Sequence, residues 1–253
     1  MLAVQRKLRI VEYVRQHRMA TIAALAKQFH VHEATIRRDL TELEQEGFLR
    51  RTHGGVILEQ WTHLEPSFNE RASHHLDQKA RIGQMAASLV ADGENVIIDS
   101  GTTTLHIAKN LVHRAHITVI TNDMNVAAEL RDAPMVNVIV TGGELYPSSY
   151  MLNGMFTEHV LRSLHVEKAF IGTPALHPKY GLMHPEARLV PAKQAMIQAA
   201  GEIIVVTDDS KIGKLSLHTV APNSSIHTLI TGTETEDIKL KPFVDQGIKV
   251  YTA

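Results

Sequence analysis

Two pairs of adjacent arginines in the first quarter of the sequence have the chemistry of a nucleic-acid contact. Arginine is the commonest bidentate partner of guanine in the major groove, and its charge also holds phosphates. The residues around both pairs add hydroxyls, a histidine and two glycines. The candidate contacts are Thr21, Thr35, Arg37, Arg38, Thr41, Arg50, Arg51, His53, Gly54 and Gly55. The competing interpretation is a solvated helix with ion pairs four residues apart, such as Arg38 with Glu42.

A second set of residues has the chemistry of a phosphate and sugar site. The stretch SGTTT, residues 100–104, follows an apolar run and precedes a helical pattern. It offers a glycine, several hydroxyls, backbone amides and the positive end of a helix dipole, all of which favour a phosphate. The alternative is an ordinary strand-to-helix turn with a threonine cap. Further along, TDDSKIGK supplies a cation for a phosphate and a carboxylate for sugar hydroxyls, at Asp208, Ser210 and Lys211.

Apolar spacing predicts the elements that position the arginines. Residues three and four apart indicate three helices, which carry Leu8, Ile10, Val11 and Val14, then Ile22, Leu25, Ala26 and Phe29, then Ile36, Leu40 and Leu43. Thr21 is placed to cap the second helix, and Gly47 falls where the third would end. The run FLRRTHGGVIL predicts a hairpin or wing. Because its apolar face must pack inward, the third helix turns its arginines outward, as a recognition helix does.

The rest of the chain alternates between strands and helices. Apolar runs at NVIID, ITVIT, VNVIVT, KAFIG, EIIVVT, HTLIT and IKVYT predict a mostly parallel sheet covered on both faces. Ligands of such sheets bind beyond the carboxyl ends of the strands. The candidates at that edge are Asp99, Ser100, Gly101, Thr102, Thr103, Thr104, Asn122, Asp123, Gly142, Gly143 and Glu144. Glu144 has two interpretations, as a general base in an isomerase-like site or as a ligand of a sugar hydroxyl.

Charge and composition support a small basic module on a larger acidic one. The chain has 253 residues and a net charge of −1. Residues 1–57 carry ten Lys and Arg against six Asp and Glu, a net of +4, which leaves 16 against 21, or −5, for residues 58–253. We expect an α/β protein with a DNA-binding domain at 1–57, a linker at 58–75 and a sensing domain at 76–253.

Several classes of site are not expected. The chain has no cysteine, which excludes disulfides and thiolate sites and suits a reducing compartment. The sixteen histidines form no HExxH motif, so no metal site is predicted, and neither a catalytic serine motif nor a cofactor is expected. Without a long apolar run, the sequence predicts neither a membrane span nor a signal peptide and favours the cytoplasm.

The first part of the chain resembles the winged helix-turn-helix of the DeoR family of bacterial transcriptional regulators. The resemblance rests on LAKQFHVHEATIRRDLTELEQEGFLRRTHGG, in which TIRRDL and RTHGG are specific to the family. The family usually has a serine where this chain has His32. The resemblance therefore implies a recognition helix without its hydroxyl cap.

The remainder resembles the same family's sugar-phosphate sensor, whose fold is similar to ribose-5-phosphate isomerase. The matching blocks are NERASHHLDQKARIG, IDSGTTT, TND, TGGELY, FIGTPAL and TDDSKIG. The resemblance implies effector contacts from the SGTTT loop, Asn122, Gly142, Gly143, Asp208 and Lys211, with Arg71 and Lys79 as charged positions in effector response. The loop TPALHPKYGL departs from the family at Pro174 and Pro178, so it is expected to differ in shape and to help select the sugar.

These observations favour a repressor of a sugar-utilisation operon that a phosphorylated sugar releases from double-stranded operator DNA. A homodimer or homotetramer is expected, because one winged module contacts a single half-site. The alternative is a sugar-phosphate isomerase or deaminase that carries a DNA-binding module. A third possibility is a regulator that activates, or that responds to a protein partner.

Overall fold

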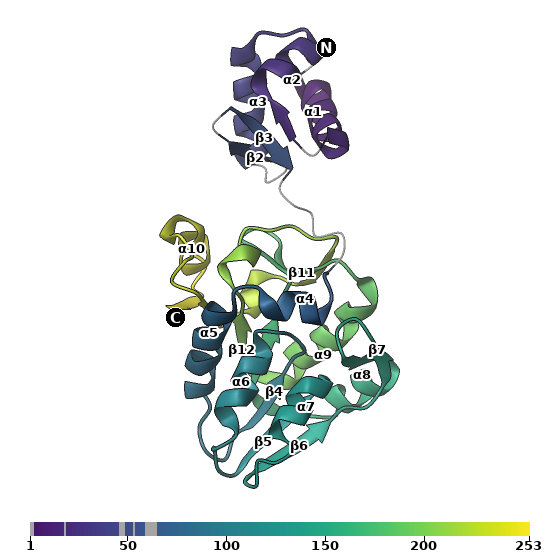
Figure 1. Cartoon of the computed structure of the whole chain (residues 1–253), viewed down its shortest axis with the longest axis vertical. Helices are drawn as coiled ribbons and strands as arrows, with labels where there is room; N and C mark the ends of the chain where they lie inside the picture. The colour runs from purple at the N-terminus through teal and green to yellow at the C-terminus, as the bar shows by residue number, and fades with distance from the viewer. Residues whose placement is uncertain (1–2, 18, 46–48, 53, 59–64) are drawn as a thin grey trace. The chain divides into compact units, whose positions relative to one another are not determined.

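The computed structural model describes residues 3–17, 19–45, 49–52, 54–58 and 65–253. The chain forms two compact units, Met1–Trp61 and Thr62–Ala253. Figure 1 shows the fold of each unit. In the part of the chain that is described, no helix is long and apolar enough to cross a membrane.

The smaller unit is a three-helix module with a three-stranded antiparallel sheet. Its elements are α1 (Ala3–His17), β1 (Met19–Thr21), α2 (Ile22–Phe29), α3 (Glu33–Gln45), β2 (Leu49–Thr52) and β3 (Gly55–Leu58). The sheet order is β1-β3-β2, so the predicted wing is the β2–β3 hairpin. Ile36, Leu40 and Leu43 are buried in one core with residues of α1 and α2, as the spacing predicts. The Thr21 hydroxyl accepts a hydrogen bond from the Ala24 amide at 3.1 Å, so the predicted cap of α2 is confirmed.

The start of α3 differs from the sequence-based expectation. The Nδ1 atom of His32 accepts a hydrogen bond from the Ala34 amide at 3.3 Å, and the His32 carbonyl accepts the Thr35 and Ile36 amides. An imidazole nitrogen that carries no proton is an acceptor, so it replaces the missing hydroxyl. The hydroxyl cap is absent as expected, but the helix start is capped by the imidazole instead. Gly47, expected to end this helix, lies outside the described residues.

The larger unit is a three-layer α/β fold. Its helices and strands are α4 (Phe68–Ser73), α5 (Leu76–Ser88), β4 (Asn95–Ile98), α6 (Thr104–Leu111), β5 (Ile117–Thr121), α7 (Met124–Leu130), β6 (Val136–Val140), β7 (Glu144–Tyr146), β8 (Met151–Asn153), α8 (Met155–Arg162), β9 (Val166–Gly172), β10 (Ala175–His177), β11 (Gly181–His184), α9 (Val190–Ala199), β12 (Ala200–Val206), β13 (His218–Ala221), β14 (Thr228–Thr231), α10 (Asp237–Val244) and β15 (Lys249–Thr252). The predicted fold class is confirmed.

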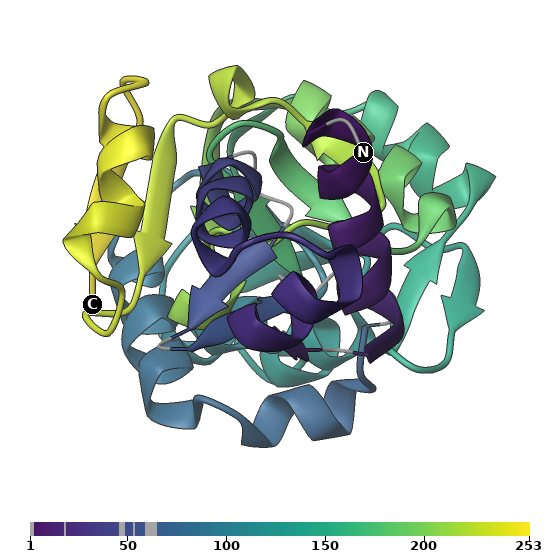
Figure 2. The same cartoon turned by 90° about the horizontal axis from the view of Figure 1, so that it is seen from above.

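Seven parallel strands form the central sheet in the order β15-β14-β12-β9-β4-β5-β6. Alternate residues of each central strand enter two separate cores. Val96 and Ile98 of β4 pack with α5, α6 and α7, which cover one face (Figure 1), whereas Ile97 packs with α8 and α9 on the other. Seen from above in Figure 2, α10 and the C-terminus lie at one end of this unit, beside the edge strand β15. Burial on both faces explains why these strands are continuous apolar runs.

Shorter elements were not foreseen from the sequence. They are the β7–β8 hairpin, the antiparallel sheet β10-β11-β13, which includes the loop with Pro174 and Pro178, and α4. Helix α4 lies within the range expected to be a linker, yet its Phe68 is buried and packs edge-on against Tyr150. Six residues are too few to show a helical period, which explains why the helix was missed.

The two wing glycines are predicted to differ in their effect on stability. A Cβ atom on Gly55 would lie 2.3 Å from the Ala20 carbonyl oxygen across the β1–β3 pair, whereas one on Gly54 would meet nothing within 4 Å. We expect Gly55→Ala to destabilise the smaller unit by about 1–3 kcal/mol through overpacking. Gly54→Ala should leave it unchanged or slightly stabilised. Scanning calorimetry of the full chain checks this, and equal effects of the two changes would contradict it.

Candidate functional site: a nucleic-acid interface and an anion-binding sheet edge

The outer face of α3 carries the predicted nucleic-acid contacts. Arg37 and Arg38 are exposed, and Thr35 and Thr41 are half-buried. The Arg37 guanidinium pairs with Glu33 at 2.8 Å, and both side chains are largely exposed, so the pair holds Arg37 only weakly. The Thr41 hydroxyl donates to the Arg37 carbonyl at 2.8 Å.

The Arg37–Glu33 pair is of the kind that the solvated-helix interpretation expects, whereas its example, Arg38 with Glu42, is not formed. Glu42 instead binds the Lys7 ammonium of α1 at 3.0 Å. Asp39 of α3, which is buried, binds the Arg6 guanidinium of α1 at 2.5 Å. These two bridges fix α3 against α1. Among the described residues no ion pair or hydrogen bond of the Arg38 side chain is found, so its guanidinium faces outward and is available to DNA.

The wing places its two arginines on a strand. Arg50 and Arg51 belong to β2 and pair with Ile57 and Val56 of β3. Their side chains, and the whole of His53, lie outside the described part of the chain. Gly54 is exposed and its carbonyl accepts the Ile22 amide at 3.2 Å, while Gly55 is buried. Gly55 therefore has a structural role in strand packing, and the DNA contact of this residue stays a prediction.

The carboxyl edge of the large sheet is organised around β4 and β9. From β4 the chain order continues through β5 to β6 on one side of the sheet, and from β9 it continues through β12 and β14 to β15 on the other. Ligand binding is therefore expected at the carboxyl ends of β4 and β9, where the order reverses. Asp99, directly after β4, accepts the Gly172 amide of β9 at 3.0 Å and forms a short hydrogen bond with the buried Lys193 of α9. Lys193 also donates to the Gly172 carbonyl at 2.9 Å. Sequence reasoning missed Lys193, because a lysine in a helix usually faces solvent.

The SGTTT loop follows Asp99 and is held from the neighbouring strand. The Gly101 amide donates to Asp123 at 3.2 Å, and the Thr104 hydroxyl donates to the Gly101 carbonyl. No acceptor for the amides of Thr102 and Thr103 is present in residues 65–253, so both N–H groups remain free for an anion. Ser100 donates to the sulfur of Met151. The arrangement at the start of α6 suits a phosphate oxygen.

Asp123 positions this loop. Its two carboxylate oxygens accept the amides of Gly101, Asn125 and Val126, which caps α7. Burial raises the pKa of Asp123 to about 6, although these backbone hydrogen bonds act in the opposite direction. Because its oxygens accept three backbone amides, Asp123 shapes the site, and its direct contact with the effector stays a prediction.

Asn122 offers a polar atom to a ligand. Its side-chain nitrogen donates to the Leu152 carbonyl at 3.0 Å, and its buried Oδ1 has no hydrogen-bond partner among the residues that the structure describes. An unsatisfied buried acceptor is costly, and a sugar hydroxyl would satisfy it. Glu144 is exposed in β7.

The predicted glycine pair holds the hairpin beside the edge. Gly142 and Gly143 have positive φ angles of 70° and 123°. A Cβ atom on Gly143 would lie 2.3 Å from the Thr157 hydroxyl, and that hydroxyl donates to the Gly142 carbonyl at 2.6 Å. The pair therefore fixes the chain between β6 and β7.

Four cationic side chains gather beyond β12. Lys79, which is buried, donates to the Arg71 carbonyl at 2.5 Å. Burial lowers the pKa of Lys79 to about 8, with Lys211 and Arg71 lowering it further and Asp208 raising it, so these charges are close neighbours. Burial and the charge of Lys211 also lower the pKa of Lys214, a residue that sequence reasoning missed. The structure thus groups the predicted residues Arg71, Lys79, Asp208 and Lys211.

Asp208 shapes the loop that carries Lys211. Its Oδ1 accepts the Ser210 amide at 3.1 Å and also the Ser210 hydroxyl. His75, Asp208 and Asp209 form a group with ligand atoms close enough to hold a cation. The neighbouring ammonium groups of Lys79 and Lys211 oppose a metal there, and they favour an anion.

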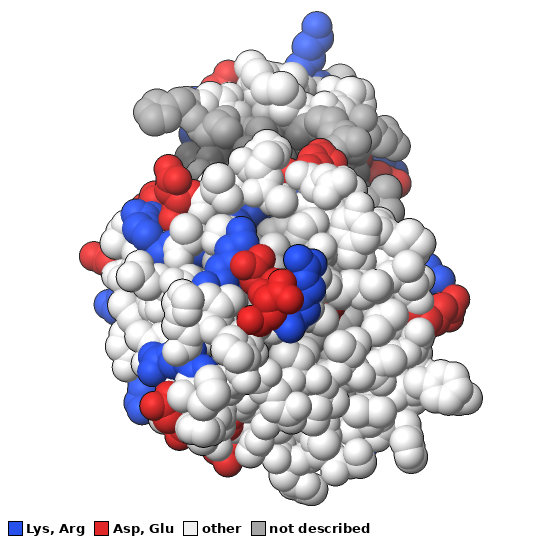
Figure 3. Space-filling model, turned by 60° about the horizontal axis from the view of Figure 1, so that its bottom comes forward, with Lys and Arg blue, Asp and Glu red and all other residues white. Residues whose placement is uncertain are grey.

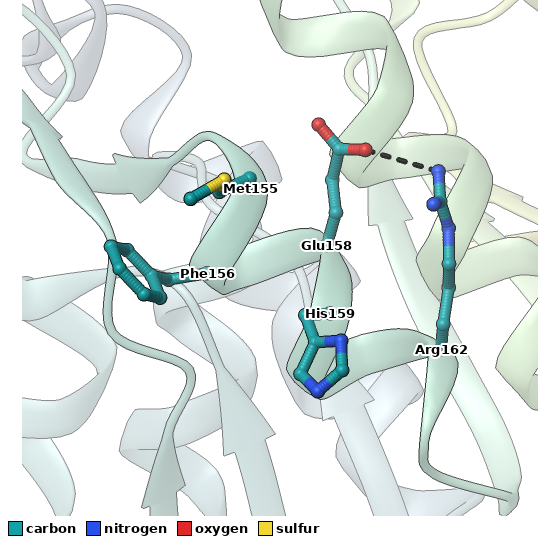
Figure 4. A pocket seen from close by; sticks show the side chains of 5 residues that line it. All are labelled: Met155, Phe156, Glu158, His159 and Arg162. Carbon is teal, nitrogen blue, oxygen red and sulfur yellow. Dashed lines mark hydrogen bonds and ion pairs between the residues drawn. The ribbon is translucent and has the colours of Figure 1, made fainter.

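A hollow beside α8 has a different character. Met155, Phe156, Glu158, His159 and Arg162 line it, all from this one helix, and Glu158 pairs with Arg162 at 3.0 Å (Figure 4). None of the predicted effector residues belongs to this lining, so the hollow is distinct from the sheet edge. On the face drawn in Figure 3, the charged side chains of the larger unit lie in small groups of both signs, which is unlike a surface for a polyanion.

Two family models match the chain. The model described as a DeoR-like helix-turn-helix domain matches residues 6–61, and the model described as a DeoR C terminal sensor domain matches residues 74–233.

Similar curated proteins match over nearly their whole length. HTH-type transcriptional repressor GlcR of Bacillus subtilis is 35% identical over 90% of this chain and 87% of its own. Transcriptional repressor AccR of Agrobacterium fabrum is 32% identical over 92% and 91%. HTH-type transcriptional regulator GolR of Listeria innocua is 28% identical over the whole of both. These relatives are regulators and not enzymes, which argues against the isomerase or deaminase alternative.

Among solved structures, ribose 5-phosphate isomerase A of Methanocaldococcus jannaschii is 17% identical over 54% of each chain, with a TM-score of 0.40. The sorbitol operon regulator SorC of Klebsiella pneumoniae is 11% identical over 96% of this chain and 99% of its own, with a TM-score of 0.44. Likenesses of this size carry no functional conclusion.

The Asp99–Lys193 pair is predicted to stabilise the larger unit strongly. Asp99→Asn leaves a buried ammonium without its counter-charge, which should cost about 3–5 kcal/mol. The double change Asp99→Asn with Lys193→Met removes that charge and should cost less than Asp99→Asn alone. Urea denaturation followed by circular dichroism measures both. Additive losses would contradict the direct pairing.

Proposed function

Because the chain belongs to the DeoR family of transcriptional regulators, we propose that it represses a sugar-utilisation operon and that a phosphorylated sugar releases it from its operator. Its first unit is a DNA-binding module of that family. The repressor names of the relatives support repression. We propose that it acts in the bacterial cytoplasm, on the nucleoid.

The observation that carries the sugar-phosphate proposal is the meeting of cations and sugar-binding groups at one sheet edge. Lys211 follows the end of β12 and the SGTTT loop follows the end of β4, on either side of β9 at the same edge of the parallel sheet, and the charge of Lys211 acts on Lys79 of α5. The buried Asn122 Oδ1, an acceptor without a partner in the described part of the chain, could accept a hydrogen bond from a sugar hydroxyl. A phosphate and a polyol in one ligand match this combination, whereas an uncharged sugar leaves the ammonium groups without a partner.

Release from DNA requires that the sugar bind two arrangements of the protein unequally. A ligand shifts the equilibrium only by its differential affinity, and the coupling is reciprocal. Operator DNA should therefore weaken effector binding by the same factor. A homodimer or homotetramer supplies the second half-site contact.

The effector site is tested with a panel of aldose and ketose phosphates. A thermal-shift screen identifies the ligand, since a ligand at 100 times its dissociation constant stabilises a fold by about 2.7 kcal/mol. Lys211→Ala should keep operator binding and lose the response to that ligand. A full response in Lys211→Ala, or turnover of any sugar phosphate at ordinary enzyme rates, would contradict the proposal.

Arg38→Ala is predicted to weaken operator binding by about 1–3 kcal/mol. The operator is selected from a random duplex pool by the wild-type protein, and affinity is measured by gel shift at several salt concentrations. Loss of base discrimination would assign Arg38 to a base, and a shallower salt dependence would assign it to a phosphate. Arg131→Ala is the control, because Arg131 is an exposed arginine of the larger unit that pairs with Asp132 next to it in sequence. Equal affinity of Arg38→Ala and wild type would remove α3 from the interface.

Effector binding is predicted to weaken as the pH rises through about 8. Burial lowers the pKa of Lys79 to about 8, so this ammonium loses its proton within the working range. The affinity should fall by up to about tenfold per pH unit above that value. Lys79→Arg retains its charge and should show a flatter profile between pH 7 and 9.5 by titration calorimetry. Parallel profiles for the two proteins would exclude Lys79 as an effector contact.

A further inference from the structure

Glu65 is the first described residue of the larger unit, and Arg71 and His184, which belong to separate elements, bind its carboxylate. Arg71 of α4 lies 2.8 Å from Oε1, and Nε2 of His184, at the end of β11, lies 3.5 Å from Oε2. The Glu65 side chain is only 18% exposed, and that of His184 2%. A carboxylate so enclosed is bound by these side chains and is not a solvated surface charge.

The Arg71 guanidinium also binds the backbone of the residue after Glu65. The Nε of Arg71 donates to the Pro66 carbonyl at 2.9 Å. His184 is oriented because its Nδ1 accepts the Glu186 amide at 3.0 Å, which leaves the proton on Nε2, towards Glu65. Burial alone would raise the pKa of Glu65, but the hydrogen bond from His184 and the charges of Arg71 and Lys193 outweigh it and lower the pKa to about 2. Glu65 therefore stays ionised at neutral pH.

This cluster shares its cations with the sheet edge. The Arg71 carbonyl accepts the Lys79 ammonium, and Lys193 binds Asp99 at the end of β4. A guanidinium that holds a carboxylate presents the same donors to a phosphate. An acidic effector at the edge therefore meets Arg71 already bound to an anion of the chain itself.

We propose that Arg71, His184 and Lys193 form an anion subsite that Glu65 occupies, and that a phosphate monoester displaces Glu65 from it. The displacement frees residues 65 and 66, which adjoin the boundary between the two units. This inference rests on the proposed effector function and adds the step that connects the ligand to the chain leading to the DNA-binding unit.

Inorganic phosphate tests the subsite without knowledge of the sugar. Its affinity is measured by titration calorimetry on the full chain for wild type, Glu65→Gln, Glu65→Asp and Glu158→Gln. Glu65→Gln should bind phosphate about tenfold more tightly, the net worth of one charge-assisted hydrogen bond. Glu65→Asp keeps a charge on a shorter side chain, so it should be intermediate and covers the case in which Glu65→Gln does not fold. Glu158→Gln is the matched control, because Glu158 also pairs with one arginine and is similarly shielded, at 23% exposed.

The outcomes separate this inference from the proposed function. Equal phosphate affinity in wild type and both Glu65 variants overturns the occupied subsite and leaves the sugar-phosphate proposal intact. Phosphate binding by none of the four proteins overturns both. Without any ligand, Glu65→Gln should also bind the selected operator less tightly than wild type and Glu158→Gln. Tighter phosphate binding with unchanged operator affinity would overturn displacement as the releasing step.

Discussion

A buried ammonium joins the two central strands of the large sheet where they end. Lys193 binds Asp99 after β4 and the Gly172 carbonyl of β9, while Asp99 accepts the Gly172 amide. An unpaired charge at this depth would be costly, so the three groups fix one another. The SGTTT loop begins at the residue after Asp99. The position of the loop that carries the free Thr102 and Thr103 amides therefore depends on this interaction.

The elements that could be predicted from the sequence are those whose buried residues recur at regular spacing. The parallel strands are covered on both faces and appear as apolar runs, and Ile36, Leu40 and Leu43 determine which side of α3 faces outward. Polar residues at strand ends were found because parallel strands end at one edge. The backbone contacts of Asp123 and Gly55 could not be predicted, because they involve residues distant in sequence.

The remaining features depend on tertiary structure and have no local signature. Lys193 has the spacing of an ordinary helical lysine, and only the packing of α9 against β9 buries it. Glu65 lies in a polar segment without helical or strand periodicity. The side chains that act on its carboxylate, Arg71, His184 and Lys193, come from α4, β11 and α9. The ring of His32 caps α3 through an atom that the usual cap preferences do not anticipate. In each case, partners far away in sequence determine the role of the residue.

The two units divide the chemistry of a regulator. One presents an arginine-bearing helix locked by the Arg6–Asp39 and Lys7–Glu42 bridges, and the other concentrates cations at a sheet edge. The most direct test is a crystal structure of the full chain with the phosphorylated sugar that stabilises it most. The account predicts the phosphate at the carboxyl edge of the sheet, within hydrogen-bond distance of the Thr102 or Thr103 amide or of the Arg71 guanidinium that Glu65 occupies in the free chain. A phosphate bound elsewhere, with these groups unoccupied, would contradict it.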